Sequence, residues 1–343
     1  MAAVSFIPYP WQQPHWQNFL QQVDQERMPH ALLLSGQKGI GKWHYAHSMA
    51  NYLLCMTPKS GLACNQCRSC QLNASTTHPD KSVVMPEDVG KQIKIDQIRQ
   101  LSNTIATTAQ QGGRKVVILG PIEQLNINAA NALLKNLEEP AADTFFILVS
   151  HVISGVMATI RSRCQILSFP VPEKNLAMSW LKEVGVTGDT SLILGMSAGA
   201  PLTAKALLDN NTSDQLSCFY DGLLKAQQST PLVDITIAKD WLDLELHDTL
   251  EWWLQLVSRT LKKSFQLSDS SPSNLIEADL SFLQTMIEIE SLAVKFNRQW
   301  LFKFTDKLIQ SKNQLLHGAN PNKQLLLEEL LMDWYAILKT AKS

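Results

Sequence analysis

The first half of the chain contains short, mostly apolar runs that alternate with segments of helical periodicity. The runs are residues 31–34, 82–85, 115–119, 145–149 and 164–169. A strand without alternation of polar and apolar residues is buried on both faces, which is typical of a parallel sheet covered by helices. The pattern therefore predicts an α/β domain with a parallel sheet and flanking helices.

The second half shows helical periodicity alone. It begins at Pro170 and Pro172, and it contains no glycine between Gly222 and Gly318. Apolar residues recur at helical spacing at Leu254, Val257 and Leu261 and again at Leu283, Met286 and Ile287. We therefore predict an all-helical region whose apolar stripes form its core.

Length and charge narrow the class of protein. The 343 residues are too many for one ordinary compact domain. Thirty basic and thirty-one acidic residues give a net charge of -1, which argues against a free-standing, non-specific nucleic-acid binder. The sequence shows neither a signal peptide nor the roughly 18 consecutive apolar residues of a membrane helix. We expect a soluble, cytoplasmic protein with no membrane segment.

A glycine-rich turn, residues 36–43, follows the first apolar run and opens a helix. Gly36, Gly39 and Gly41 allow backbone amides to face phosphate oxygens, and Lys42 stands where a lysine reaches the terminal phosphates. The next position requires Ser or Thr to bind Mg²⁺, but it holds Trp43, which cannot ligate a metal. The motif is therefore partial. Nucleotide binding stays open beside a strand-to-helix turn without a ligand.

A second catalytic group is missing from the strand at residues 115–119. An NTPase that binds phosphate with such a glycine-rich turn carries an Asp, usually followed by Glu, at the end of such a strand. Here the strand runs into Gly120 and Pro121, and Glu123, which follows later, is expected on the surface. The chain is therefore predicted not to hydrolyse ATP.

Four of the six cysteines, Cys55, Cys64, Cys67 and Cys70, lie within sixteen residues. Thiolates separated by two residues can converge on one ion, and four sulfurs complete a closed, tetrahedral zinc site. The spacing predicts a structural zinc module at about residues 55–70, without an open position for catalysis. The alternative is a set of reduced thiols without a metal.

Five segments occur in a fixed order over roughly the first 170 residues. They are residues 30–36, the cysteine cluster, and residues 77–80, 129–140 and 162–164. Together they resemble the clamp-loader branch of the AAA+ superfamily, and within that branch the clamp-loader subunits of bacterial DNA polymerase III. A weaker similarity continues through residues 197–201.

The resemblance implies three domains and a set of partners. The domains are an AAA+-like domain at residues 1–170 with the zinc module, a small helical lid at 171–212, and a helical collar for oligomerisation at 213–343. The implied partners are the gamma/tau and delta subunits of a hetero-oligomeric ring. Through the assembled complex, the chain would act on the sliding clamp and on primed DNA.

The resemblance also implies a role for Arg163. In such a ring each ATP lies at an interface, and the neighbouring subunit supplies an arginine in trans to the γ-phosphate. Active gamma/tau members carry Thr or Ser in place of Trp43, Asp-Glu in place of Gly120 and Pro121, and Arg at the position of Leu202. The departures imply a non-hydrolysing stator that keeps its own arginine finger. An active gamma/tau-type ATPase and a zinc-dependent DNA-binding module are the alternatives.

Overall fold

The chain divides into two compact units, Met1–Trp180 and Leu181–Ser343. The computed structural model describes residues 7–88, 91–111, 113–208, 210–228, 233–265, 296–316 and 321–340, together with Met286, Ile289 and Ala319. The predicted division at residues 170 and 212 stays a prediction. Within the part of the chain that is described, no helix is long and apolar enough to cross a membrane.

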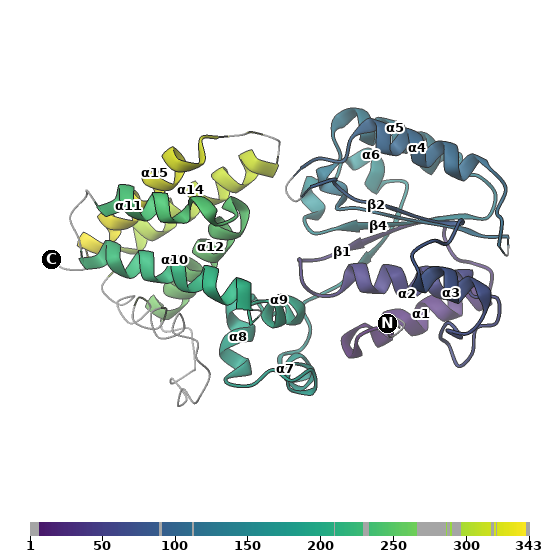
Figure 1. The fold of residues 1–343 in the computed structure, drawn as a ribbon, viewed down its shortest axis with the longest axis horizontal. Coiled ribbons are helices and arrows are strands. Elements are labelled where there is room, and N and C mark those ends of the chain that lie inside the picture. The colour runs from purple at the N-terminus through teal and green to yellow at the C-terminus, as the bar shows by residue number, and fades with distance from the viewer. Residues whose placement is uncertain are drawn as a thin grey trace. The chain divides into compact units, whose positions relative to one another are not determined.

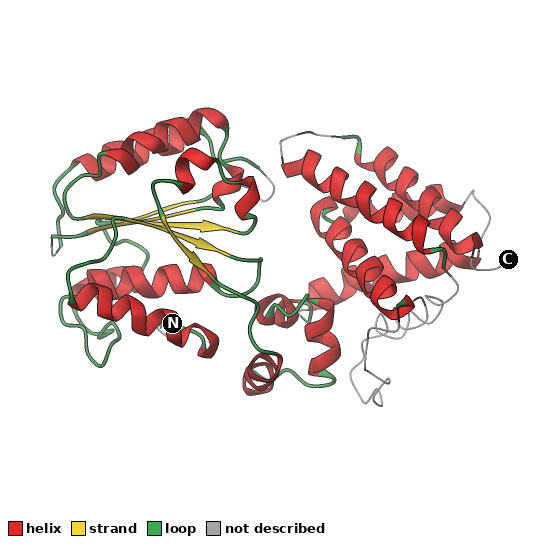
Figure 2. Cartoon of the chain, turned by 180° about the vertical axis from the view of Figure 1, so that it is seen from behind, coloured by secondary structure: helices red, strands yellow, loops and turns green. Residues whose placement is uncertain are grey.

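The first unit is built on a five-stranded parallel sheet, drawn in yellow in Figure 2. The strand order is β2-β3-β4-β1-β5. The strands are β1 (Ala31–Ser35), β2 (Lys81–Val84), β3 (Lys115–Leu119), β4 (Thr144–Ser150) and β5 (Gln165–Ser168). Every pairing is parallel, and Leu33 on β1 lies opposite Leu148 on β4 and Ile166 on β5. The predicted parallel sheet is confirmed.

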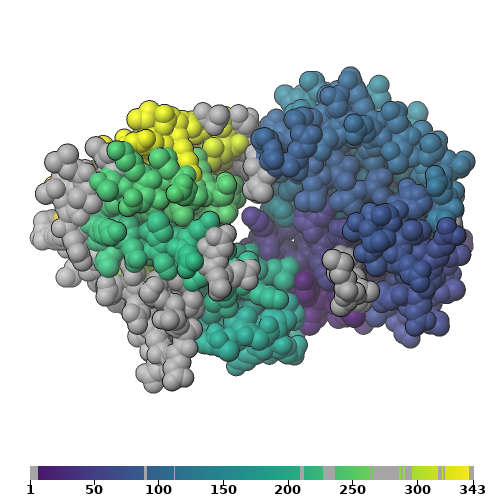
Figure 3. Space-filling model, viewed as in Figure 1, coloured from purple at the N-terminus to yellow at the C-terminus, as the bar shows by residue number. Residues whose placement is uncertain are grey.

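Helices cover both faces of this sheet (Figure 1). One face carries α4 (Ile95–Ala106), α5 (Ile127–Glu138) and α6 (Ala158–Arg161), and the other carries α1 (Gln13–Asp24), α2 (Lys42–Leu54) and α3 (Arg68–Ala74). The unit also contains the 3₁₀ turns η1 (Pro10–Gln12), η2 (Ile122–Gln124) and η3 (Ile153–Gly155), and α7 (Lys174–Glu183) begins near its end. The outer sides of α4 and α5 form part of the unit's surface, blue in Figure 3.

The central strands are apolar throughout because both of their sides are covered. On β3, Val117 belongs to the cluster of buried residues shared with α4 and α5. Its neighbours Val116 and Ile118 point to the opposite face, where they are equally buried. The unbroken apolar run at residues 115–119 thus reflects two packed layers of helices.

The two edge strands differ from this expectation. On β2, the Val83 side chain is 44% exposed, and on β5 Ile166 is 45% exposed. An edge strand has a neighbour on one side only, so fewer helices can cover it. The expectation that all five runs are buried on both faces is therefore wrong for β2 and β5.

The second unit is helical, as predicted. Its elements are α8 (Thr190–Met196), α9 (Pro201–Ala206), α10 (Asn210–Gln228), α11 (Val233–Asp240), η4 (Trp241–Asp243), α12 (Leu246–Ser264), α14 (Arg298–Leu316) and α15 (Lys323–Thr340). Of the predicted stripes, Val257 is fully buried, and Leu254 and Leu261 pack against the same core. Leu283 and Ile287 lie outside the described residues.

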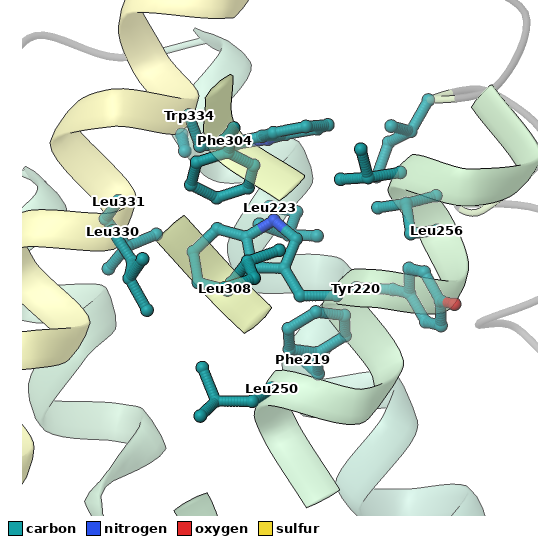
Figure 4. Packing of buried hydrophobic residues seen from close by; sticks show 14 of the residues in the cluster. Phe219, Tyr220, Leu223, Leu250, Leu256, Phe304, Leu308, Leu330, Leu331 and Trp334 are labelled. Atoms are coloured by element: carbon teal, nitrogen blue, oxygen red, sulfur yellow. The ribbon is translucent and has the colours of Figure 1, made fainter. Parts of the chain in front are cut away.

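Aromatic rings fill the core of this unit. Phe219 of α10, Phe304 of α14 and Trp334 of α15 converge from different helices (Figure 4). The Trp253 ring of α12 lies between them, with centroid distances of 5.3 Å to Phe304 and 6.2 Å to Trp334. Edge-on contacts of this kind add to the stabilisation that burial provides.

Candidate functional site

The glycine-rich turn connects the carboxyl end of β1 to the start of α2. Gly41 directly precedes the first helical residue, and its φ of 90° lies in the left-handed region that favours glycine. A Cβ atom on Gly36 would approach the carbonyl oxygen of Phe169 to 2.3 Å. Packing therefore requires glycine at positions 36 and 41, whether or not a phosphate binds. Gly39 lies between these two positions.

Lys42 is the first residue of α2, and it is only 2% exposed. Its ammonium donates to the carbonyl oxygens of Gly36 and Gln37, the latter at 2.6 Å. Burial lowers the pKa of Lys42 from its ordinary value of 10.5 to about 8, although the charge of Glu123 acts in the opposite direction. The structure thus brings Lys42 and the turn together, with the ammonium bonded to the turn's own carbonyls.

Residues 9–12, which directly precede α1, pack against the glycine-rich turn. The Trp11 indole donates to the carbonyl oxygen of Ile40 at 2.9 Å, and the Gln12 amide donates to that of Gly41 at 3.0 Å. The Tyr9 ring stacks on Trp11 with 4.9 Å between centroids. A Cβ atom on Gly41 would come within 2.7 Å of Tyr9, so this packing is another reason for the glycine.

The structure also shows what occupies the positions of the two missing catalytic groups. Trp43 follows Lys42 on α2, half-buried, with its ring 6.3 Å from that of His47. Gly120 directly follows β3, and a Cβ atom there would lie 2.5 Å from the carbonyl oxygen of Val149 on β4. The backbone therefore leaves no room for any side chain at position 120, and an Asp there would require β4 to shift.

Glu123 is not the surface residue that the sequence suggested. Its Oε1 accepts a hydrogen bond of 2.8 Å from the backbone N–H of His151. Its Oε2 is buried and has no hydrogen-bond partner among the described residues. The reason is the η2 turn after β3, which directs this side chain back towards the end of β4 instead of into solvent.

The structure brings the four clustered cysteines together. Cys55 is the C-cap that follows α2, Cys67 caps the start of α3, and Cys70 lies within α3. All four sulfur atoms lie within 4.8 Å of one another, with 4.0 Å between Cys55 and Cys67 and 3.9 Å between Cys64 and Cys70. Four sulfurs at 2.3 Å from a tetrahedral ion lie about 3.8 Å apart. The separations therefore suit a metal ion.

Hydrogen-bond donors favour the thiolate form of Cys64, whereas burial raises the pKa of the Cys55 and Cys70 thiols. The hydroxyl of Thr57 and the backbone N–H groups of Gln66 and Cys67 lower the pKa of the Cys64 thiol to about 5. The backbone N–H of Cys64 in turn points at the sulfur of Cys55, 3.3 Å away. Metal ligation requires the thiolate form. The polar contacts of Cys64 therefore agree with its role as a metal ligand.

A buried hydrogen-bond chain fixes the cysteine cluster to the sheet. Ser69 of α3 donates to the carbonyl oxygen of Leu54 and accepts from Nε2 of His78 at 2.8 Å. Nδ1 of His78 then accepts from the backbone N–H of Asp80 at 3.1 Å. These partners require a neutral histidine with its proton on Nε2. The segment at residues 77–80 thereby connects α3 to the start of β2.

Arg163 lies in the turn between α6 and β5, with its side chain 35% exposed. It stands two residues before Gln165, which pairs with Leu32 near the amino end of β1. The glycine-rich turn begins after Ser35, at the carboxyl end of the same strand. Because all the strands are parallel, Arg163 lies where the strands begin and Lys42 lies where they end. We call these two sides of the sheet its amino edge and its carboxyl edge. The structure does not bring Arg163 and Lys42 together.

Two family descriptions match the chain. "DNA polymerase III, delta subunit" matches residues 11–173, and "DNA polymerase III, delta subunit, C terminal" matches residues 215–336. The DNA polymerase III subunit delta' of Pseudomonas aeruginosa is 36% identical over 332 residues, which are 96% of this chain and 98% of that relative. The chain belongs to the DNA polymerase III subunit delta' family.

Other delta' relatives have similar coverage. The subunit delta' of Yersinia pestis is 31% identical over 340 residues, 97% of this chain and 96% of the relative. A solved DNA polymerase III gamma subunit-related protein from Thermotoga maritima is 18% identical and has a TM-score of 0.47, covering 96% of this chain and 99% of that one. Membership in the delta' family confirms the clamp-loader resemblance and, with the parallel sheet, the AAA+-like fold class.

One contact in this delta' chain was missed by the sequence-based reasoning. Glu138, the last residue of α5, forms an ion pair with Arg163 at 2.5 Å. Glu138 belongs to the run at residues 129–140 that supports the resemblance, but nothing in that run indicates a partner. The two residues are far apart in sequence and meet only because α5 ends beside the turn after α6.

The lowered pKa of Lys42 predicts a pH-dependent contribution to stability. The folded-state pKa of about 8 lies below the ordinary 10.5, so the unfolded state binds more protons in this window and the free energy of unfolding rises with pH. Lys42→Met lacks this contribution. The free energy of unfolding of wild type minus that of Lys42→Met should increase by about 2 kcal/mol between about pH 8 and pH 10.

Urea denaturation at a series of pH values measures this difference. Lys91→Met is the matched control because the Lys91 side chain is 62% exposed, and it should follow wild type across the same pH range. Parallel pH profiles for wild type and Lys42→Met would contradict the burial of a charged ammonium at this position.

Proposed function

We propose that this delta' chain is a non-hydrolysing subunit, or stator, of the DNA polymerase III clamp loader. In this proposal it helps to load the sliding clamp onto primed DNA and supplies Arg163 in trans to a neighbouring ATPase subunit. Its partners are the gamma/tau and delta subunits of a hetero-oligomeric ring. The collar at residues 213–343 serves assembly, and the lid at residues 171–212 connects it to the AAA+-like domain.

The position of Arg163 carries this proposal. An arginine at the amino edge of the sheet cannot reach a phosphate bound at the glycine-rich turn of its own chain, since that turn is at the carboxyl edge. A guanidinium that serves catalysis from this edge must therefore act on a second subunit. An arginine finger supplied in trans is worth about 10³–10⁵ in rate in related NTPases.

The absence of hydrolysis is supported by packing. Trp43 replaces the Mg²⁺-binding hydroxyl, and Gly120 has no space for a carboxylate beside Val149. Both groups are needed to hold the metal and orient water. Nucleotide binding by Gly36, Gly39, Gly41 and Lys42 without hydrolysis stays open, because the turn keeps its shape through contacts that need no ligand.

The purified chain is expected to show no ATP hydrolysis above background in the presence of Mg²⁺. Trp43→Thr is expected to behave like wild type, because restoring the hydroxyl leaves position 120 without a carboxylate. Release of inorganic phosphate, with contaminating ATPase controlled by a Lys42→Met preparation, measures this. A wild-type rate of roughly 1 s⁻¹ or more, in the usual range of enzymes, would identify an active gamma/tau-type ATPase instead.

Arg163→Ala is expected to lower ATP turnover of the assembled clamp loader and to leave its assembly intact. The ATPase site that faces Arg163 should lose about 10³-fold or more in rate, so total turnover falls by that site's share. Steady-state turnover with clamp and primed DNA, together with size-exclusion chromatography of the complex, measures both effects.

Two variants control this experiment. Arg163→Lys keeps the charge but not the planar fork that contacts two oxygens, so it should rescue turnover poorly. Arg161→Ala removes a neighbouring arginine of α6 and should leave turnover unchanged. Unchanged turnover in Arg163→Ala would exclude the proposed role of this residue.

We also infer that Cys55, Cys64, Cys67 and Cys70 hold a structural zinc ion. A closed set of four thiolates leaves no position for a substrate, and zinc is the ion that such tetrahedral sulfur sites usually hold. The ion would cross-link the end of α2 to α3 and so stabilise the residue 55–70 module, while Ser69 and His78 attach that module to the sheet.

Metal analysis of the purified chain should find about one equivalent of zinc. Cys67→Ser removes one ligand and should lower both the zinc content and the melting temperature. Cys164→Ser removes a thiol outside the cluster and should keep the full metal content. Full zinc in Cys67→Ser would refute this ligand set.

A further inference from the structure

Three oxygen atoms of the same domain hold the guanidinium of Arg163. Its Nη1 donates to the carbonyl oxygen of Thr159 at 2.9 Å and to the hydroxyl of Ser162 at 3.4 Å. Its Nη2 lies 2.5 Å from Oε1 of Glu138. Thr159 and Ser162 are neighbours of Arg163 in the chain, so Glu138 provides the one long-range contact among these three.

We propose that Glu138 is a positioning residue for Arg163: it orders the guanidinium before the phosphate of a neighbouring subunit arrives. This inference rests on the proposed function, because it assigns a role to Glu138 only if Arg163 acts in trans. Arginine has many rotamers, and fixing one of them in advance removes an entropic cost from each turnover.

The position of Glu138 is itself well fixed. Leu133 and Leu137 on the same helix are buried at 0% and 2% exposure, so the end of α5 is anchored to the sheet. The backbone N–H of Glu139 bonds to the carbonyl oxygen of Lys135 and closes the last turn. A carboxylate on a packed helix end is a more rigid support than one on a loop.

Helix electrostatics do not explain a carboxylate at this position. The carboxyl end of a helix carries partial negative charge, so an acidic residue in the last turn is unfavourable there. Glu138 is the last residue of α5. The guanidinium of Arg163 compensates this repulsion. The stability of α5 alone therefore does not account for Glu138, whereas its contact with Arg163 does.

The anchored guanidinium keeps donors for a ligand. An arginine has five N–H bonds, and the contacts to Thr159, Ser162 and Glu138 use three of them. The other two, one on Nε and one on Nη2, have no partner among the described residues. Since the Arg163 side chain is 35% exposed, a phosphate group can reach these donors while Glu138 still holds the other side.

The ion pair between Arg163 and Glu138 should add little to the stability of the domain. The side chains of Arg163 and Glu138 are 35% and 47% exposed, and pairs exposed to this degree contribute little to stability. Loss of the pair should therefore leave the domain folded and change only the order of the guanidinium. The expected effect on rate is correspondingly modest.

The test uses the assembled clamp loader and the Arg163-dependent part of its ATP turnover, defined as wild type minus Arg163→Ala. Glu138→Ala should lower the kcat of this part by about two- to five-fold, the size of an exposed charge-pair interaction, with KM for ATP unchanged. Glu138→Gln should retain more activity, because its amide oxygen can still accept from Nη2. Glu139→Ala, which removes the adjacent charge, should match wild type.

A double variant separates positioning from a structural effect. In the Arg163→Ala background, Glu138→Ala should change nothing further, because the group that it positions is absent. A further fall in that background would assign the effect to general structure and overturn the proposal. Turnover that is unchanged or raised in Glu138→Ala, while Arg163→Ala lowers it, would overturn the proposal and leave the proposed function standing. If Arg163→Ala itself has no effect, the proposed function fails, and the role of Glu138 with it.

Discussion

The parallel direction of all five strands is the constraint on which the first unit depends. It places every carboxyl strand end at one edge of the sheet and every amino end at the other. The glycine-rich turn with Lys42 occupies the first edge, and Arg163 occupies the second. The proposed function uses the amino edge, where Arg163 faces a neighbouring subunit, and leaves phosphate binding at the carboxyl edge open.

The two edges depend on different contacts. At the carboxyl edge, Lys42 donates hydrogen bonds to the glycine-rich turn. Trp11 and Gln12 donate to carbonyl oxygens of the same turn. At the amino edge, Arg163 rests on Glu138 and on the turn after α6. Among the described residues, no hydrogen bond or ion pair joins Lys42 to Arg163, so a substitution at one edge need not disturb the other. In the proposed function, this separation allows the chain to keep Arg163 for a neighbouring subunit while its own glycine-rich turn lacks the catalytic groups.

Local sequence patterns were sufficient for some features and not for others. Apolar runs predicted the central strands, and cysteine spacing predicted the four-sulfur cluster, because in both cases the signal lies within a few residues. The exposure of Val83 and Ile166 depends on strand order, which no local run encodes. The pair between Glu138 and Arg163 and the inward direction of Glu123 depend on which helix ends meet which turns. Such contacts are set by tertiary packing rather than by spacing along the chain.

The close approach of Gly120 to Val149 has a consequence for how this chain could change by substitution. A single codon change from Gly to Asp would introduce a Cβ atom 2.5 Å from a backbone oxygen of β4, so the first step back to a strand-end carboxylate would be destabilising by itself. The backbone of β4, and Trp43 as well, would have to change before such a step conferred any advantage. In the proposed stator, the lack of hydrolysis would therefore be hard to reverse by single substitutions, because the change at position 120 alone is destabilising and restores no activity.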